Sequence, residues 1–311
     1  IWVQCHSYRA DEILMMARLA KEFGFKIGAM QHALEAYKIA PELAAAGVGV
    51  SMFSDHWGYK LEAYDAIPAG PALCYRAGVN TSVNTDGTSG FSAIILDAAK
   101  LIRSGGLTEN EAFRTITINP AKQLGVDHRV GSIEVGKDAD LTLWDAHPFS
   151  VHAKCTMTLI EGEVFFERRD KHGVGKSPAA SLDLTIPKQT KLLPVPKLGK
   201  TYAITGGTVH PVSGPAIPGG TVVLQDGKII AVGKDVSIPG GAIRVNARGL
   251  NVYPGMIDAG TALGLAEIGP IPVMIDLSET GEFQPDIVAG TAVQRESAFF
   301  GTALCHGITS T

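Results

Sequence analysis

The sequence has few cysteines, and none is placed for a disulfide scaffold or a cysteine-based zinc cage. The four cysteines stand singly at positions 5, 74, 155 and 305, without the C-x-x-C spacing that such sites use. No run of 18 apolar residues is present, so we expect neither a membrane-spanning helix nor a membrane partner. The formal net charge is −4, which argues against the basic face of a nucleic-acid-binding protein.

The composition is that of an ordinary globular protein. Hydrophobic residues make up 45% of the 311 positions and charged residues 19%, enough to bury a sizeable core over about two domains. Both ends lie inside apolar or β-branched runs, because the chain begins with Ile1 and ends in ALCHGITST. We therefore expect a fragment of a longer soluble protein. Whether it is cytoplasmic or periplasmic, and whether it forms a homo-oligomer, stays open.

Residues 1–126 alternate strand and helix patterns. The strand patterns cover 2–6, 26–32, 47–53 and 79–86, and the helical patterns cover 10–24, 40–46, 65–77, 91–104 and 108–124. The last of these begins with a capping box, Thr108 followed by Glu111. Such alternation predicts a parallel α/β sheet. Four units make either a small open sheet or half of an eight-stranded (β/α)8 TIM-type barrel.

From residue 127 the pattern changes to short strands and turn glycines. We assign β-strands to 127–170 and 201–256, with a hairpin turn at Asp226-Gly227. The lysine- and proline-rich stretch 171–200 between them is typical of a linker. We expect the two strand segments to be antiparallel and to pack into one small β-sandwich, because isolated hairpins are marginally stable. Residues 257–311 form the last segment.

Three side chains suited to metal binding follow strands of the N-terminal region. His6 ends the first strand, His32 the second and Asp86 the fourth. Since parallel strands of a barrel end on one rim, these side chains are expected to converge. Two histidines and a carboxylate suit a catalytic Zn²⁺ and also a non-haem Fe(II). The alternative is that both histidines are ordinary half-buried residues and Asp86 a helix cap.

Weaker candidates lie nearby on the same expected rim. His56 follows the third strand, and Tyr8 and Arg9 follow His6 directly. All three are candidates for contacts with substrate, Arg9 with a substrate carboxylate. Roles in an exposed loop or on the surface are equally open for them.

Residues 106–148, GLTENEAFRTITINPAKQLGVDHRVGSIEVGKDADLTLWDAHP, resemble the C-terminal signature of the metal-dependent amidohydrolase superfamily, in its imidazolonepropionase-like branch. The resemblance extends to HSYRADEI, to QHALEAYKIAPELAAAGV and to VNTD. It implies that His6 and His32 match the metal-binding histidines after the fifth and sixth barrel strands. Asp86 matches the aspartate of the eighth strand, which binds metal and shuttles the proton.

Residues 201–264 resemble the opposite end of the same family, its N-terminal sandwich and first barrel strand. Where the family has an H-x-H pair of ligands, this sequence has Gly260 and Ala262, whose side chains offer no ligand atom. The order implies a piece of a tandem amidohydrolase. The C-terminal half of one copy (1–170) is followed by the start of a second, degenerate copy (201–311).

The resemblance implies a hydrolase that acts on carbon–nitrogen bonds other than peptide bonds, through a metal-activated hydroxide. Its substrate would be a small amide, cyclic amide or dipeptide-like molecule, and its cofactor a divalent metal, with zinc favoured and iron or manganese open. We expect this fragment alone to be inactive. The alternative is a non-catalytic binding or assembly module on a degenerate amidohydrolase fold. An unrelated iron oxygenase gives no account of the 106–148 signature.

Overall fold

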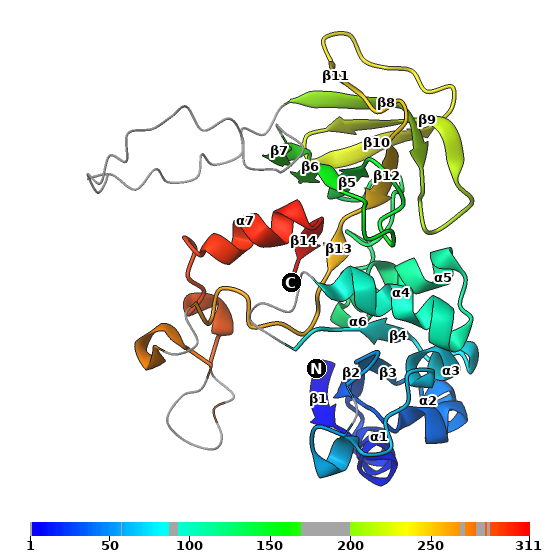
Figure 1. The fold of residues 1–311 in the computed structure, drawn as a ribbon, viewed down its shortest axis with the longest axis vertical. Coiled ribbons are helices and arrows are strands. Elements are labelled where there is room, and N and C mark those ends of the chain that lie inside the picture. The colour runs from blue at the N-terminus through cyan, green and yellow to red at the C-terminus, as the bar shows by residue number, and fades with distance from the viewer. Residues whose placement is uncertain are drawn as a thin grey trace. The chain divides into compact units, whose positions relative to one another are not determined.

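The computed structural model describes residues 2–56, 58–86, 93–168, 200–267, 271–277, 284 and 287–311. The chain forms two compact units (Figure 1). The first comprises Ile1–Ser132 and Pro254–Thr311, and the second comprises Ile133–Tyr253. Of the expected linker, 171–199 lies outside the described residues. No helix among the described residues is long and apolar enough to cross a membrane.

A four-stranded parallel sheet organises the first unit. Its strands are β1 (Trp2–Ser7), β2 (Lys26–His32), β3 (Gly49–Met52) and β4 (Thr81–Val83), in that spatial order. The helices are α1 (Ala10–Phe23), α2 (Ala40–Ala46), α3 (Gly70–Arg76) and α4 (Ile94–Gly105), with short 3₁₀ turns at Ala36–Ile39 and Leu61–Ala63. The alternation that the sequence predicts is confirmed. Because the four strands are parallel, their carboxyl ends lie along the same end of the sheet.

Apolar spacing on the helices explains how they cover this sheet. In α1 the buried residues Ile13, Ala17 and Ala20 recur at helical spacing and pack with Met30 and Leu43 in one core. The helix ends at Gly24, whose φ of 71° is left-handed and therefore favours glycine. This core lies between the sheet and the helices. The polar residues singled out from the sequence lie at the carboxyl ends of the strands.

The single helix expected over 108–124 is wrong, because the structure divides it into α5 (Glu109–Arg114) and α6 (Ile118–Leu124). The Thr115 and Thr117 hydroxyls donate to the carbonyls of Ala112 and Phe113, and such back-bonding competes with helix continuation. Pro120 lies in the first turn of α6. Proline is accepted in the first turn of a helix but disrupts a helix interior, so a helix cannot run through this position unbroken. The predicted capping box at the start of α5 is confirmed.

The segment assigned to a second barrel belongs to the same compact unit as β1–β4. Its strands β13 (Met256–Ile257) and β14 (Ile308–Ser310) pair in parallel, with α7 (Ala298–Cys305) before β14 and 3₁₀ turns at Pro272–Met274 and Ala289–Thr291. The Asp86 amide donates to the Gly260 carbonyl at 3.0 Å, and the Thr85 hydroxyl donates to Asp258 at 2.7 Å. Residues 257–260 thus run beside the end of β4.

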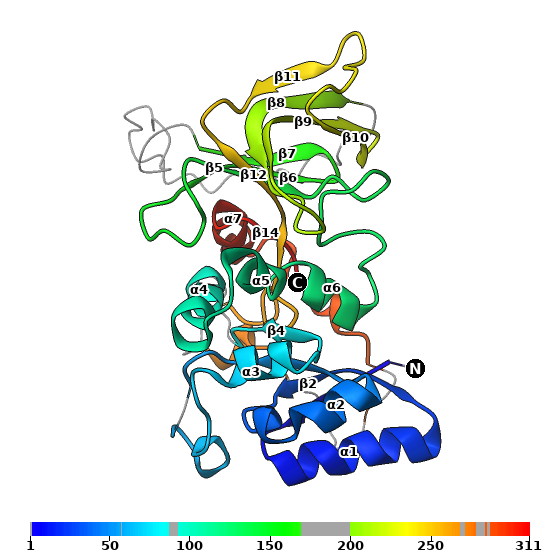
Figure 2. The same ribbon diagram turned by 90° about the vertical axis from the view of Figure 1, so that its right-hand side faces the viewer.

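The second unit is built on one eight-stranded sheet (Figure 2). Its order is β10-β9-β8-β12-β5-β6-β7, with β11 also paired to β8. The bounds are β5 (Leu141–Trp144), β6 (Cys155–Ile160), β7 (Glu163–Glu167), β8 (Thr201–Val209), β9 (Ile217–Gln225), β10 (Lys228–Gly233), β11 (Ile243–Asn246) and β12 (Asn251–Pro254). Strands from both expected segments share this sheet. The antiparallel expectation is wrong for β11 and β12, which pair with β8 in parallel.

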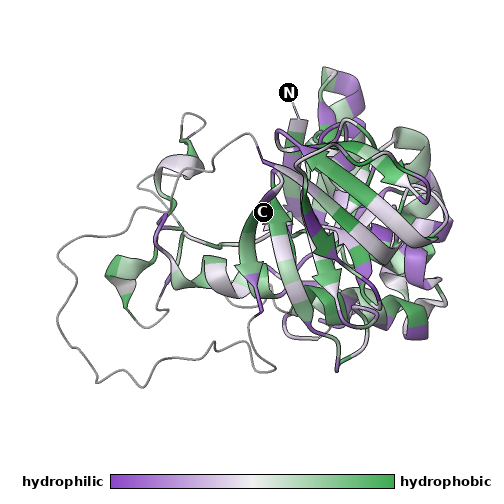
Figure 3. Ribbon diagram, turned by 90° about the horizontal axis from the view of Figure 1, so that it is seen from above, coloured by the Kyte–Doolittle hydropathy of each residue, from purple (hydrophilic) through white to green (hydrophobic). Residues whose placement is uncertain are grey.

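Apolar residues from both strand segments form the core of this sheet. Leu141 and Leu143 of β5 cluster with Val222 and Leu224 of β9, all fully buried. Figure 3 shows that hydrophobic residues recur along the strands of the ribbon. The hairpin between β9 and β10 turns at Asp226-Gly227 with φ of 51° and 76°, as the sequence predicts.

Candidate active site

His6 and His32 meet at the carboxyl ends of β1 and β2. The two strands are adjacent and parallel, so residues near their ends lie on one rim. His6 Nδ1 lies 2.7 Å from His32 Nε2. His32 is only 3% exposed, whereas His6 is open to solvent. The structure therefore brings together the two histidines that the sequence singles out.

The backbone at His32 is unusual. His32 and Ala33 have φ of 67° and 40°, two consecutive left-handed residues that are not glycine. The surrounding contacts hold this bend, because the Ala33 amide donates to the Ser7 carbonyl at 2.9 Å and the Glu35 amide donates to the Tyr8 carbonyl at 3.0 Å. Conformations of this kind cost on the order of 1–3 kcal/mol and concentrate at functional sites.

Two aromatic rings stack on the His32 imidazole. The centroid distance is 4.8 Å for Tyr8 and 4.9 Å for Phe53. The Lys60 ammonium lies 3.6 Å from the centroid of the Tyr8 ring. His32 Nδ1 is buried without a hydrogen-bond partner among the described residues. The stacked rings restrict the orientation of the imidazole, and its Nε2 is the nitrogen that faces His6.

Burial sets the protonation state of His32. It lowers the pKa of this imidazole to about 4, and the charges of His6 and Lys60 act in the same direction, whereas the Asp86 carboxylate raises it. The neutral imidazole therefore dominates at pH 7. A neutral imidazole is the form that binds a metal ion.

Asp86 lies on the same rim, beyond the end of β4. Its φ of 49° is left-handed, its amide is held by the Gly260 carbonyl, and its side chain is exposed. Across the described part of the chain, no three His, Cys, Asp or Glu side chains lie close enough to hold a metal ion. The structure pairs His6 with His32 and does not bring Asp86 into that pair. The ligand roles of all three stay predictions.

The weaker candidates have distinct surroundings. Tyr8 contacts His32 directly, as described above. His56 lies against Phe53 with a ring centroid distance of 4.6 Å, and its Nδ1 is 3.6 Å from the Asp55 carboxylate. Arg9 is engaged at the surface, since its Nε is 3.1 Å from an Asp11 carboxylate oxygen. Tyr8 and His56 thus border the histidine pair, while Arg9 is held in a local ion pair.

Gly260, one of the two positions that lack the expected histidine pair, lies beside this rim. A Cβ added at Gly260 would meet Asn84 Cβ at 3.3 Å and Gln31 Oε1 at 3.4 Å, so a larger side chain there would force these neighbours to move. Asn84 is buried and donates to Ser51 Oγ at 2.7 Å. Amides and hydroxyls therefore occupy the space beside Gly260.

Sequence reasoning missed two residues of this region. Phe53 directly follows β3 and could have been found from its position on the same rim. Asp258 is fully buried, and burial raises the pKa of its carboxyl to about 6 although the Thr85 hydroxyl donates to it. No sequence signal separates Asp258 from an exposed turn aspartate, because its burial depends on residues more than 170 positions away.

Comparison with known proteins supports the resemblance to amidohydrolases. Residues 65–171 match the model of the amidohydrolase family. Amidohydrolase tasK of Hapsidospora irregularis is 27% identical over 289 residues, which cover 86% of this chain and 29% of that protein. Imidazolonepropionase of Maricaulis maris is 36% identical over 133 residues, 42% of this chain and 32% of that protein. The chain thus spans about a third or less of these relatives.

A solved structure also shows similarity to an amidohydrolase. The crystal structure of an amidohydrolase from Thermotoga maritima aligns with a TM-score of 0.50 and 36% sequence identity, covering 54% of this chain and 44% of that one. The predicted resemblance to the amidohydrolase superfamily and its imidazolonepropionase-like branch is confirmed. None of these comparisons supports the non-catalytic alternative.

Proposed function

Since residues 65–171 match the amidohydrolase family, we propose that the protein is a metal-dependent hydrolase of carbon–nitrogen bonds in small molecules. Its substrates are amides, cyclic amides or dipeptide-like compounds rather than protein chains. The observation that carries the proposal is the His6–His32 pair, with 2.7 Å between its nitrogens at the carboxyl ends of two adjacent parallel strands. Active sites of barrel enzymes lie at this end of the strands.

The residues present fit part of a divalent metal site. His32 offers a neutral, buried imidazole, and its Nε2 faces His6 Nδ1, so these two nitrogens are the atoms that would share a metal ion. Imidazole suits zinc and also iron, whereas manganese prefers oxygen ligands. Asp86 would complete a set of two histidines and one carboxylate. Gly260 and Ala262 add no ligand. Any further ligands would come from segments of the parent protein that correspond to the parts of the relatives that this chain does not cover.

A bound divalent metal would lower the pKa of water and polarise the substrate carbonyl. The residues of this chain perform the remaining tasks. His6 and His32 would hold the metal, and Tyr8 and Phe53 restrict the orientation of the His32 ring. The Asp86 carboxylate accepts the proton of the attacking water and passes it to the leaving nitrogen. His56 lies next to Phe53, at a position from which it can contact substrate.

We also propose that the chain is the junction of a tandem amidohydrolase. Residues 1–170 are then the C-terminal half of one copy, and 201–311 are the start of a second copy that has lost its first ligand pair at Gly260 and Ala262. The alignment with amidohydrolase tasK supports this order, because it covers 86% of the chain within one protein about three times as long.

The test uses the full-length parent protein. We expect stoichiometric divalent metal by emission spectroscopy and turnover on a panel of amides and hydantoin-like rings. His32→Ala should lower metal occupancy. Asp86→Asn should lower turnover by ~10²–10⁴-fold or more while some metal remains, because an amide cannot accept the water proton. Wild-type rates in Asp86→Asn would remove this residue from the mechanism and contradict the proposal.

A further inference from the structure

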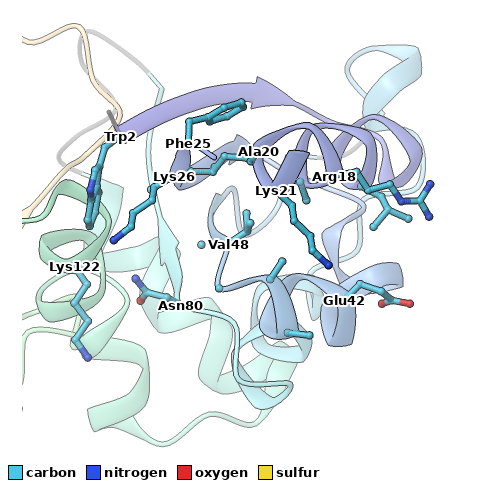
Figure 4. A pocket seen from close by; sticks show the side chains of 18 residues that line it. Trp2, Arg18, Ala20, Lys21, Phe25, Lys26, Glu42, Val48, Asn80 and Lys122 are labelled. Carbon is cyan, nitrogen blue, oxygen red and sulfur yellow. The ribbon is translucent and has the colours of Figure 1, made fainter. Parts of the chain in front are cut away.

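A groove lies at the amino ends of the same strands, away from the histidine pair. It is lined by the first residues of β1 and β2, by Gly49 at the start of β3, by faces of α1 and α2, and by Lys122 of α6 (Figure 4). Trp2 of this groove and His6 of the histidine pair are four residues apart on β1, about 13 Å at the usual strand rise. The groove is therefore separate from the candidate active site.

The groove has the size and floor of a small-molecule site. Its volume is about 810 Å³, within the ~300–1,000 Å³ typical of such sites. Buried apolar residues form the floor, among them Ala20, Ile27 and Val48. The rings of Trp2 and Phe25 also line it. Such a surface suits the flat apolar body of a ligand.

The rim of the groove is strongly basic. Arg18, Lys21, Lys26 and Lys122 line it against one acidic residue, Glu42. Within the described residues, none of these four cations forms an ion pair. Figure 4 shows Lys21 extending from α1 toward the side of the lining that carries Glu42, and Lys26 extending from the start of β2 toward the side that carries Asn80 and Lys122. Unpaired cations around an apolar floor attract an organic anion.

We propose that this groove binds a small organic anion, with a flat apolar body against the apolar lining and its acidic group held by the basic rim. The charge of the lining selects this occupant. A neutral ligand would leave the concentrated positive charge uncompensated, and a cation would be repelled. The proposal does not depend on the hydrolase function, because the groove lies away from the histidine pair.

The test uses the 311-residue chain and anilinonaphthalene sulfonate, an aromatic anion whose emission rises on binding. We expect saturable binding that weakens with added salt, because screening reduces the attraction of exposed charges. Lys21→Gln combined with Lys26→Gln should weaken binding about tenfold at low salt. The matched control is Lys200→Gln combined with Lys234→Gln, two exposed lysines outside the groove, and it should change binding less than about twofold.

Two further variants locate the dye. Ala45→Phe fills the groove from an exposed position on α2 and should abolish saturable binding while the circular dichroism spectrum stays unchanged. Trp2→Phe should remove most of the quenching of tryptophan emission by the dye, whereas Trp144→Phe should not. The proposal is overturned if the wild-type chain shows no saturable binding. It is equally overturned if the groove variants bind like the wild type.

Discussion

His32 combines three features that rarely coincide in one residue. Its backbone is left-handed, its ring is stacked against Tyr8 and Phe53, and its Nδ1 is buried without a partner among the described residues. The first feature costs strain and the third an unmet hydrogen bond. Their coincidence is explained if the imidazole is held ready for a ligand. His32 is thus the residue that gives the strongest evidence for a site at this rim.

The stacking on His32 predicts a positioning role for Tyr8. In the parent protein, Tyr8→Ala should weaken metal binding by about 10–100-fold, the range seen when residues that orient a ligand are lost. Tyr8→Phe keeps the ring and should bind metal almost as the wild type does. Competition with a chromophoric chelator measures both affinities. Equal affinity in Tyr8→Ala would show that the stacked ring does not orient His32.

Asp258 predicts a pH dependence of stability. Its pKa is raised by burial from 3.8 to about 6, so folding favours the protonated form. This group costs nothing below about pH 4, and its ionisation destabilises the fold increasingly as the pH rises through 6. The full cost is about 3 kcal/mol, at ~1.4 kcal/mol for each pKa unit. Asp258→Asn cannot ionise and can still accept the Thr85 hydroxyl.

We therefore expect Asp258→Asn to gain stability relative to the wild type between pH 4 and pH 7.5. Denaturant unfolding of the chain at several pH values measures this difference. The loss of the long contact from the Gly260 amide, 3.4 Å in the wild type, is the same at every pH and does not mask the trend. A pH-independent difference would show that the carboxyl is not buried as described.

At the scale of elements, local signals predicted most of what the first unit contains. Apolar spacing placed α1, and its C-terminal glycine placed its end. The same reasoning failed between α5 and α6, because hydroxyl back-bonding by Thr115 and Thr117 breaks a helix without changing its apolar pattern. The parallel pairing of β11 and β12 with β8 could not be predicted either. Such pairing depends on contacts between strands that are distant in sequence, and local patterns do not report these contacts.

The capping box of α5 gives a prediction at this scale. Thr108 Oγ1 accepts from the Glu111 amide at 3.2 Å, and the Glu111 carboxylate accepts from the Thr108 amide at 2.8 Å. Thr108→Ala should destabilise the chain by about 1 kcal/mol. Thr108→Ser retains the hydroxyl and serves as the matched control, with little loss. Denaturant midpoints measure both, and equal midpoints for the two variants would contradict a capping role.

At the scale of the whole molecule, sequence reasoning reached part of the site. It predicted that His6 and His32 lie close together, because neighbouring parallel strands end on one rim. It did not find the stacked rings, which depend on side-chain rotamers of residues on three different strands and loops. Nor did it find that residues 257–260 lie beside β4, because the resemblance assigns them to another copy. The hydrogen bonds from the Asp86 amide to the Gly260 carbonyl and from the Thr85 hydroxyl to Asp258 fix that placement.

The two compact units have separate hydrophobic cores, which predicts separate responses to core mutations. Leu143 is buried in the core of the second unit, and Met30 is buried in that of the first. Leu143→Ala and Met30→Ala should each cost about 2–5 kcal/mol, through lost burial and an unfilled cavity. Hydrogen exchange at peptide resolution should show the lost protection confined to the unit that carries the substitution, because residues far apart with no shared contacts act independently. Loss of protection in both units from either variant would show that the chain unfolds as one cooperative body.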